Sequence, residues 1–195
     1  MKTDIVIAGV GGQGILSIAV ILGTVAVNNN LNIKHAEVHG MSQRGGAVYS
    51  HVRVSDSPVA SDLIPLGKAD LVLSVEPLEA MRYIPYLSPQ GKLVTNIHSF
   101  VNMGNYPEPQ NVLGHLKSMA NAILIDAEAL ASKKASNMVM LGAAAPFIDI
   151  ATVEFEKAIN SVFEAKGQEV IEMNINAFRE GFRAAKEAND GATKK

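Results

Sequence analysis

A glycine-rich turn between an apolar run and an apolar helix constrains this chain more than any other feature of its sequence. The apolar run covers Asp4–Ala8, the turn reads Gly-Val-Gly-Gly-Gln-Gly over residues 9–14, and the pattern that follows predicts a helix over Ile15–Val27. In a strand–turn–helix unit, glycines let the backbone approach a phosphate, and the first free N–H groups of the helix point at it. The turn therefore predicts a phosphate or nucleotide site with the candidate residues Gly9, Gly11, Gly12, Gln13 and Gly14.

Short apolar runs separated by helical patterns predict an α/β fold. Six runs are interpreted as strands: Asp4–Ala8, Ile33–Val38, Ala47–Val54, Ala69–Val75, Lys92–Asn96 and Ala122–Ile125. Most are continuous, which is typical of strands covered on both faces. Ala47–Val54 instead alternates, and it follows Ile33–Val38 too closely for a crossover helix. We therefore expect a three-layer sandwich with a mostly parallel, Rossmann-like sheet, one antiparallel hairpin and a helical C-terminal segment.

The predicted helices alternate with these strands and then fill the chain from residue 127 onward. They cover Ile15–Val27, Pro77–Leu87, Asn137–Ile148, Val153–Ala165 and Gln168–Ala188, and an irregular loop is expected over Asn102–Gln110. In the last helix an apolar seam recurs at 4-3-4-3 spacing, formed by Ile171, Ile175, Phe178, Phe182 and Ala185. This seam favours packing on its own domain, and docking on a partner subunit is the alternative. Residues 1–190 are expected to form one domain and residues 191–195 a flexible tail.

Composition excludes several classes of function. Of 195 residues, 48% are hydrophobic and 18% charged, as in globular proteins, and a net charge of −2 leaves no basic footprint for nucleic acid. The chain has no cysteine, which excludes a disulfide framework, a thiolate nucleophile and a cysteine-ligated iron–sulfur cluster on this chain. We recognise no signal peptide and no apolar run of membrane-spanning length, so we expect a cytoplasmic protein that does not bind membranes.

A second glycine-rich stretch, residues 39–46, lies between the two strands of the expected hairpin and reads His-Gly-Met-Ser-Gln-Arg-Gly-Gly. The Arg44 guanidinium is a planar fork suited to a phosphate or a carboxylate. Gly45 and Gly46 permit a close approach of the backbone. Beside the first turn, this stretch would complete an anion pocket, which adds the candidate residues Ser42, Gln43, Arg44, Gly45 and Gly46. The alternative is a wide hairpin whose arginine faces solvent or pairs with Glu37.

No other group of residues forms a recognisable catalytic or metal site, so we expect neither in this chain. Glu37 follows the first turn at the spacing of the acidic residue in dinucleotide-binding folds, which leaves NAD binding as an alternative. Five histidines match no zinc spacing, although His39 and His51 could face each other across the hairpin. Glu76 and Glu79 open a predicted helix, where carboxylates offset the helix dipole. Glu76 also lies at a strand tip and is kept as a candidate site residue.

Four motifs occur along the chain: GVGGQG at residues 9–14, EVHGMSQRGG at 37–46, LIP at 63–65 and EPLEA at 76–80. In this order and spacing they closely resemble the gamma-type subunit of the 2-oxoacid:ferredoxin oxidoreductase family. The resemblance covers about residues 1–190, nearly the whole chain. The second and fourth motifs point to the branch of that family that acts on indolepyruvate.

The resemblance implies a subunit of a larger enzyme that is inactive in isolation. The family oxidatively decarboxylates a 2-oxoacid, here indolepyruvate or a related aryl pyruvate, joins the acyl group to coenzyme A and reduces ferredoxin. Thiamine diphosphate, magnesium and iron–sulfur clusters would reside on a large alpha subunit, and none of them on this chain alone. Coenzyme A carries a diphosphate and a 3′-phosphate, so we expect this chain to contribute to an anion-binding or cofactor-proximal site that the alpha subunit completes. The residues expected to form it here are Gly11, Gly12, Gln13 and Arg44. The alternatives are a small stand-alone NAD(P)-dependent enzyme and a nucleotide-binding module without catalysis.

Overall fold

Six strands form one mixed sheet in the computed structural model, which describes residues 1–39, 45–101 and 104–192. They are β1 (Lys2–Val10), β2 (Asn32–His39), β3 (Ala47–Ser55), β4 (Ala69–Ser74), β5 (Leu87–Asn96) and β6 (Ala122–Ile125). Their order across the sheet is β2-β3-β1-β4-β5-β6. β1, β4, β5 and β6 run parallel to one another, as the continuous apolar runs predicted.

The predicted antiparallel hairpin is confirmed and forms one edge of the sheet. β3 lies between β2 and β1 and runs antiparallel to both. Valines alternate with aromatic and polar residues along β3 because its two faces meet different parts of the fold. Val52 and Val54 belong to the core that contains α1, whereas the rings of Tyr49 and His51 meet the aromatic rings that follow β4.

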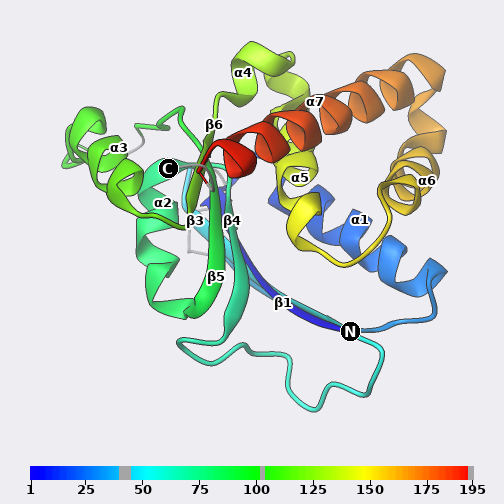
Figure 1. Ribbon diagram of the computed structural model, residues 1–195. Helices are drawn as coiled ribbons and strands as arrows, with labels where there is room; N and C mark the ends of the chain where they lie inside the picture. Colours follow the sequence, from blue (N-terminus) through cyan, green and yellow to red (C-terminus); the bar gives the residue numbers. More distant parts are fainter. Residues whose placement is uncertain (40–44, 102–103, 193–195) are drawn as a thin grey trace.

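Helices cover both faces of the sheet, so the three-layer sandwich is confirmed (Figure 1). One layer contains α1 (Ile15–Asn28), α5 (Ser136–Ala144), α6 (Thr152–Phe163) and α7 (Gln168–Ala192). The other contains α2 (Pro77–Tyr83) and α3 (Pro109–Ser118), and a short α4 (Ala127–Leu130) follows β6. In the described part of the chain, no helix has both the length and the apolar character that crossing a bilayer requires.

Successive residues of β1 belong to two separate hydrophobic clusters. Ile5 and Ile7 are buried in the larger cluster, with the side chains of α1, α5, α6 and α7. Val6, between them, is buried with Val72 and Leu93 in the smaller cluster on the opposite face. Side chains alternate across a strand, so a strand covered on both faces is apolar at most positions rather than at every second one.

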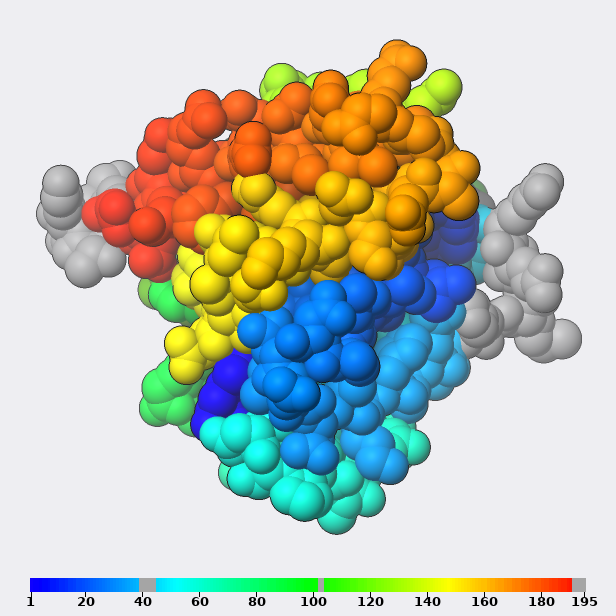
Figure 2. All heavy atoms as spheres, turned by 90° about the vertical axis from the view of Figure 1, so that its right-hand side faces the viewer, coloured from blue at the N-terminus to red at the C-terminus, as the bar shows by residue number. Residues whose placement is uncertain are grey.

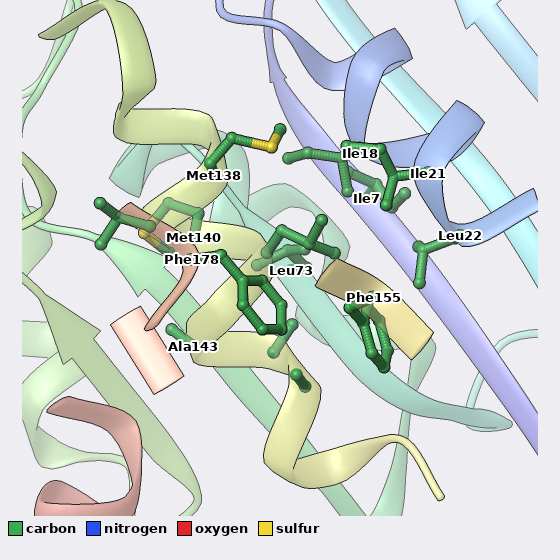
Figure 3. Close-up of a cluster of buried hydrophobic side chains, with 14 of the residues drawn as sticks. Ile7, Ile18, Ile21, Leu22, Leu73, Met138, Met140, Ala143, Phe155 and Phe178 are labelled. Carbon is green, nitrogen blue, oxygen red and sulfur yellow. The ribbon is translucent and has the colours of Figure 1, made fainter. Parts of the chain in front are cut away.

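α5 and α7 cross where each helix carries a glycine. A Cβ atom on Gly142 would overlap the carbonyl group of Phe178, and a Cβ atom on Gly181 would overlap that of Val139. Without those side chains, the two backbones come into direct contact. Phe178 also stacks on Phe155 of α6, with ring centroids 5.5 Å apart (Figure 3). The seam predicted for the last helix therefore packs on its own domain.

Prolines shorten two of the predicted helices, those that begin at residues 77 and 137. α2 ends at Tyr83, and a 3₁₀ turn that contains Pro85 follows it. α5 ends at Ala144 and is likewise followed by a 3₁₀ turn, which contains Pro146. A proline lacks the N–H group of a regular helix and clashes with the preceding turn, so neither segment continues as an α-helix.

Other boundaries differ from the prediction as well. β5 begins at Leu87, the last residue of the second predicted helix, rather than at Lys92 as predicted. α3 begins at Pro109, a residue tolerated in the first helical turn, so the loop expected over Asn102–Gln110 ends early. α7 is helical through Ala192, two residues into the tail expected over residues 191–195, and the last three residues of that tail lie outside the described part.

Candidate functional site

The first glycine turn joins β1 to α1 and is closed by Gln13. Gln13 Oε1 accepts the N–H of Val10 at 2.8 Å, and the N–H of Gln13 donates to the carbonyl of Val10 at 3.1 Å. Gly12 and Gly14 have φ angles of +99° and +82°, which residues with a Cβ rarely adopt. A Cβ atom on Gly12 would meet no atom within 4 Å, so its backbone faces open space. Gln13 thus stabilises the turn, and Gly12 exposes it.

The second glycine stretch meets the first at this edge of the sheet. The N–H of Gly11 donates to the carbonyl of Gly46 at 2.8 Å, and the N–H of Gly45 donates to the carbonyl of Gly11 at 3.4 Å. The two stretches are therefore joined, and Gly11 uses its N–H group within the fold. The candidate residues between them lie outside the described residues: Ser42, Gln43 and Arg44.

A pocket of about 350 Å³ opens beside the first glycine turn, at the carboxyl ends of the parallel strands. Ligands of open α/β sheets bind at this edge, where neighbouring connections leave the sheet in opposite directions. Here the chain after β1 continues toward β2, and the chain after β4 continues toward β5 on the other side. Gly11, Gly12, Gln13 and Gly14 line the pocket. Gly9 instead packs inside the fold, because a Cβ atom there would overlap the side chain that follows β4.

Two lysines that the sequence analysis missed stand on the same wall of the pocket. Lys133 and Lys134 open a 3₁₀ turn directly before α5. Lys133 Nζ lies 3.9 Å from the carboxylate of Glu128, and its side chain is largely exposed. Cations beside a helix N-terminus oppose the helix dipole, so an anion at this point would relieve an unfavourable arrangement. A Lys-Lys pair just before a predicted helix is the sequence signal that could have found them.

Asn137 holds the start of α5 against the glycine turn. Its Nδ2 donates to the carbonyl of Gly14 at 3.3 Å, and a Cβ atom on Gly14 would overlap the Asn137 side chain. Gly14 is therefore required both for its positive φ and for this contact. The N-termini of α1 and α5, the open backbone of Gly12 and two lysines now border one pocket, and such an arrangement can bind an anionic group.

Glu76, kept as a candidate from the sequence, is used within the fold. Its Oε2 accepts the N–H of Glu79 at 2.8 Å and so caps α2. Its Oε1 accepts the N–H of Phe100 at 3.2 Å and the hydroxyl of Tyr106. Burial and the hydrogen bond to Glu76 raise the pKa of Tyr106 to about 12, so this hydroxyl remains a donor. Glu76 therefore ties the loop before α3 to the start of α2.

The described histidines do not gather at one place. The register of β2 and β3 puts Ala36 opposite His51 and Val48 opposite His39, so these two histidines are not paired across the hairpin. His51 is buried, and its Nδ1 accepts a backbone N–H at 2.8 Å. At the pocket, His98 Nε2 lies 2.7 Å from Asp126 Oδ1, and this hydrogen bond lowers the pKa of Asp126. Among the described residues, no three His, Cys, Asp or Glu side chains are arranged to hold a metal ion.

The order of the strands disfavours a dinucleotide site around Glu37. In a Rossmann fold, the strand that carries the acidic residue is the direct neighbour of the strand before the glycine turn. Here antiparallel β3 lies between β1 and β2. Glu37 accepts a hydrogen bond from the hydroxyl of Ser50 on β3 at 3.1 Å. The NAD(P) alternative therefore lacks the neighbouring strand that would present its ribose ligand.

Comparison with known proteins gives consistent matches along the sequence. Residues 4–184 match the family described as pyruvate ferredoxin/flavodoxin oxidoreductase. The chain is similar to indolepyruvate oxidoreductase subunit IorB of Methanothermobacter thermautotrophicus, with 38% identity over 199 residues. That match covers 96% of this chain and 100% of the relative.

Two solved structures share the fold. The 2-oxoglutarate:ferredoxin oxidoreductase of Magnetococcus marinus, determined with 2-oxoglutarate, coenzyme A and succinyl-CoA bound, has a TM-score of 0.75 and 20% identity. The match covers 95% of this chain but only 31% of that longer chain. The gamma subunit of a keto/oxoacid ferredoxin oxidoreductase from Geobacter sulfurreducens has a TM-score of 0.68 and 23% identity, with 95% and 99% of the two chains covered.

Proposed function

The chain belongs to the pyruvate ferredoxin/flavodoxin oxidoreductase family, and we propose from this that it is the small subunit of an indolepyruvate oxidoreductase. One observation carries the proposal: 96% of this chain matches the full length of a relative that is named as a subunit of indolepyruvate oxidoreductase. The family resemblance drawn from the four sequence motifs is thereby confirmed. In the complex, an aryl pyruvate is oxidatively decarboxylated, its acyl group is joined to coenzyme A, and ferredoxin accepts the electrons.

The redox groups of this reaction belong to a partner. Thiamine diphosphate with magnesium, together with the iron–sulfur clusters, is assigned to a large alpha subunit. The sequence supports this division because it has no cysteine to ligate a cluster. The described residues also offer no group of three His, Cys, Asp or Glu side chains for a metal. This chain therefore contributes binding and orientation, which is what protein supplies in cofactor enzymes.

The pocket beside the glycine turn is proposed to hold an anionic part of coenzyme A. Support comes from the two adjoining helix N-termini, the open backbone of Gly12, and Lys133 and Lys134 on the wall. One helix-end contact with an anion contributes only about 0.3–1 kcal/mol, so the lysines are needed for useful affinity. Ser42, Gln43 and Arg44 are proposed to complete the site with the alpha subunit.

Reconstitution tests the function. The chain is co-expressed with the large subunit, and indolepyruvate oxidation is followed with coenzyme A and ferredoxin present. We expect turnover from the complex and none from either subunit alone. NAD(P) reduction by the isolated chain, or full activity of the large subunit without it, would contradict the proposal.

Substitutions in the complex test the site. We expect the double variant Lys133→Gln/Lys134→Gln to raise KM for coenzyme A about tenfold or more, since charged hydrogen bonds contribute about 1.5–3 kcal/mol each. KM for indolepyruvate should stay unchanged. Arg44→Ala is expected to act in the same direction. Lys117→Gln, an exposed lysine on α3, is the control and should change neither constant. Unchanged KM values in all variants would rule out this pocket as the coenzyme A site.

A further inference from the structure

α1 is apolar over most of its surface although it lies at the surface of the fold, and its polar residues Ser17, Thr24 and Asn28 lie together on one side. Its sequence over residues 15–28 contains no charged residue. Its inner side is fully used, because Ile18, Ile21, Leu22 and Val25 are buried in the larger core cluster. The side of a surface helix that faces away from the core is normally polar, whereas α1 has the exposed apolar side chains of Leu16, Val20 and Val27 there. The outer side of α1 therefore lacks a cover within the described part of the chain.

The uncovered side is a single stripe of α1, formed by Leu16, Val20, Gly23 and Val27. These residues are spaced i, i+4, i+7 and i+11, which places them on one face of a helix. Leu16 is 56% exposed, Val20 44% and Val27 65%. In Figure 2, α1 (blue) lies in the middle of the visible face, between the C-terminal helices above it and the residues of β2 (light blue) beside it. A partner can reach this stripe directly.

The stripe leads into a second groove at the glycine turn. This groove, of about 270 Å³, is lined by Leu16, Glu37, Val48 and the glycines of the turn. Leu16 thus belongs to both the stripe and the groove. The pocket with the two lysines lies on the other side of the same turn, since Gly11, Gly12 and Gly14 line both cavities. A partner that completes that pocket at the turn also approaches the start of the stripe.

We infer that the α1 stripe is the docking surface for the large subunit of the enzyme. The inference rests on the proposed function, which requires that subunit to complete the site at the glycine turn. The same fold is 31% of a single longer chain in the Magnetococcus marinus enzyme and nearly all of a separate subunit in Geobacter sulfurreducens. A fold that occurs both as part of a longer chain and as a separate subunit must have a surface that packs against the remainder of the enzyme. The absence of charge on α1 requires the facing surface of the partner to be apolar too.

The stripe is the centre of this interface rather than the whole of it. Stable interfaces bury about 800 Å² on each partner, more than the exposed parts of three aliphatic side chains supply. A few central residues usually dominate binding, and the surrounding contacts exclude water. Introducing a charge at the centre should therefore weaken the complex strongly without disturbing the fold, because the substituted side chains already face solvent in the isolated chain.

The test compares Val20→Glu and Val27→Glu with Leu66→Glu in the full chain. Leu66 is 65% exposed, as Val27 is, and lies in the loop between β3 and β4, outside the stripe. Affinity for the purified large subunit is measured by titration, and circular dichroism and thermal melting of each chain check the fold. We expect Val20→Glu and Val27→Glu to bind at least about tenfold more weakly, with unchanged melting temperature, and Leu66→Glu to bind as the unchanged chain does.

The outcomes separate this inference from the proposed function. If the unchanged chain does not bind the large subunit, both fail. If it binds and the two α1 variants bind equally well, the stripe is not the docking surface, and the proposed function still stands. If the isolated chain dimerises, and the α1 variants lose the dimer but keep their affinity for the large subunit, a second copy occupies the stripe and the inference is wrong.

Discussion

The two long helices of the larger layer, α1 and α7, use their apolar residues in different ways. α7 confines them to one seam, which packs on α5, and pairs charges on its other sides, as between Arg179 and Glu156. α1 has apolar residues on its outer side as well as on its inner side, and the core covers only the inner one. The apolar side of α7 is thus covered by other parts of the same chain. α1 has more apolar surface than its own chain covers, as expected when the folding unit is smaller than the working enzyme.

The two sides of the glycine turn repeat this contrast. The pocket is lined by many polar groups and by two lysines, Lys133 and Lys134, against one carboxylate, Glu128, whereas the groove that begins at Leu16 is mostly apolar. One side is suited to an anionic ligand and the other to an apolar protein surface. The glycine turn, which the sequence predicted to bind a phosphate, therefore lies between a pocket suited to an anion and a groove suited to an apolar protein surface.

The largest expected change in stability comes from substitutions on the two sides of α1. Leu22→Ala, on the inner side at 2% exposure, should lower the free energy of unfolding of the isolated chain by about 2–5 kcal/mol, because it leaves a cavity. Val27→Ala, on the stripe, should change it by less than about 0.5 kcal/mol. Urea denaturation measures both. Equal losses would mean that the stripe is already covered in the isolated chain, and the contrast with α7 would disappear.

The crossing of α5 and α7 should give the next largest effect. Gly142→Ala forces the two backbones apart, and we expect a loss of about 1–3 kcal/mol in the free energy of unfolding. Gly114→Ala is the matched control, because a Cβ atom there meets nothing within 4 Å. In the helix α3 it should stabilise the chain by up to about 1 kcal/mol. A stable Gly142→Ala variant would show that α7 does not lie against α5 as closely as the structure has it.

Local patterns predicted most of the fold. The continuous apolar runs identified the parallel strands because a strand buried on both faces is apolar at most positions, and the short link before Ala47 required an antiparallel return. The ends of helices were predicted less well. The 3₁₀ turns at Pro85 and Pro146 depend on how each proline fits against the preceding turn, which hydrophobic periodicity does not register.

The candidate site could be predicted only in part, because its members are far apart in the sequence. The glycine turn is a local motif and was found. Lys134 reaches the same pocket from more than a hundred residues away, through the packing of α5. Glu76 was misleading for the same reason, since its partners Phe100 and Tyr106 approach only in the folded chain. A local sequence motif therefore predicts the glycine turn, but not the residues that reach its pocket from other parts of the chain.

Two buried carboxylates, Asp4 and Glu79, differ in the same way, because one has its hydrogen-bond partners within the chain and the other lacks one within the part of the chain that the structure describes. Burial raises the pKa of Asp4, but hydrogen bonds from Arg53, at 2.8 and 3.1 Å, and from Lys2 outweigh it, and the net pKa is lowered. For Glu79, burial dominates and raises the pKa, and its Oε2 has no hydrogen-bond partner among the described residues. Their contributions to stability should therefore change with pH in opposite directions.

The pH dependence of stability should give the smallest effect, and its sign is the test. The contribution of Asp4 is present above the ordinary Asp pKa of 3.8 and is lost as pH falls through the lower folded value. Glu79 binds its proton more tightly in the fold, so its contribution is lost as pH rises from 4.5 through the higher folded value. On acidification, the stability of the unchanged chain should fall relative to Asp4→Asn and rise relative to Glu79→Gln. Urea denaturation between pH 3 and pH 7 measures both differences, and a change of the same sign in the two would mean that Glu79 gains a partner in solution.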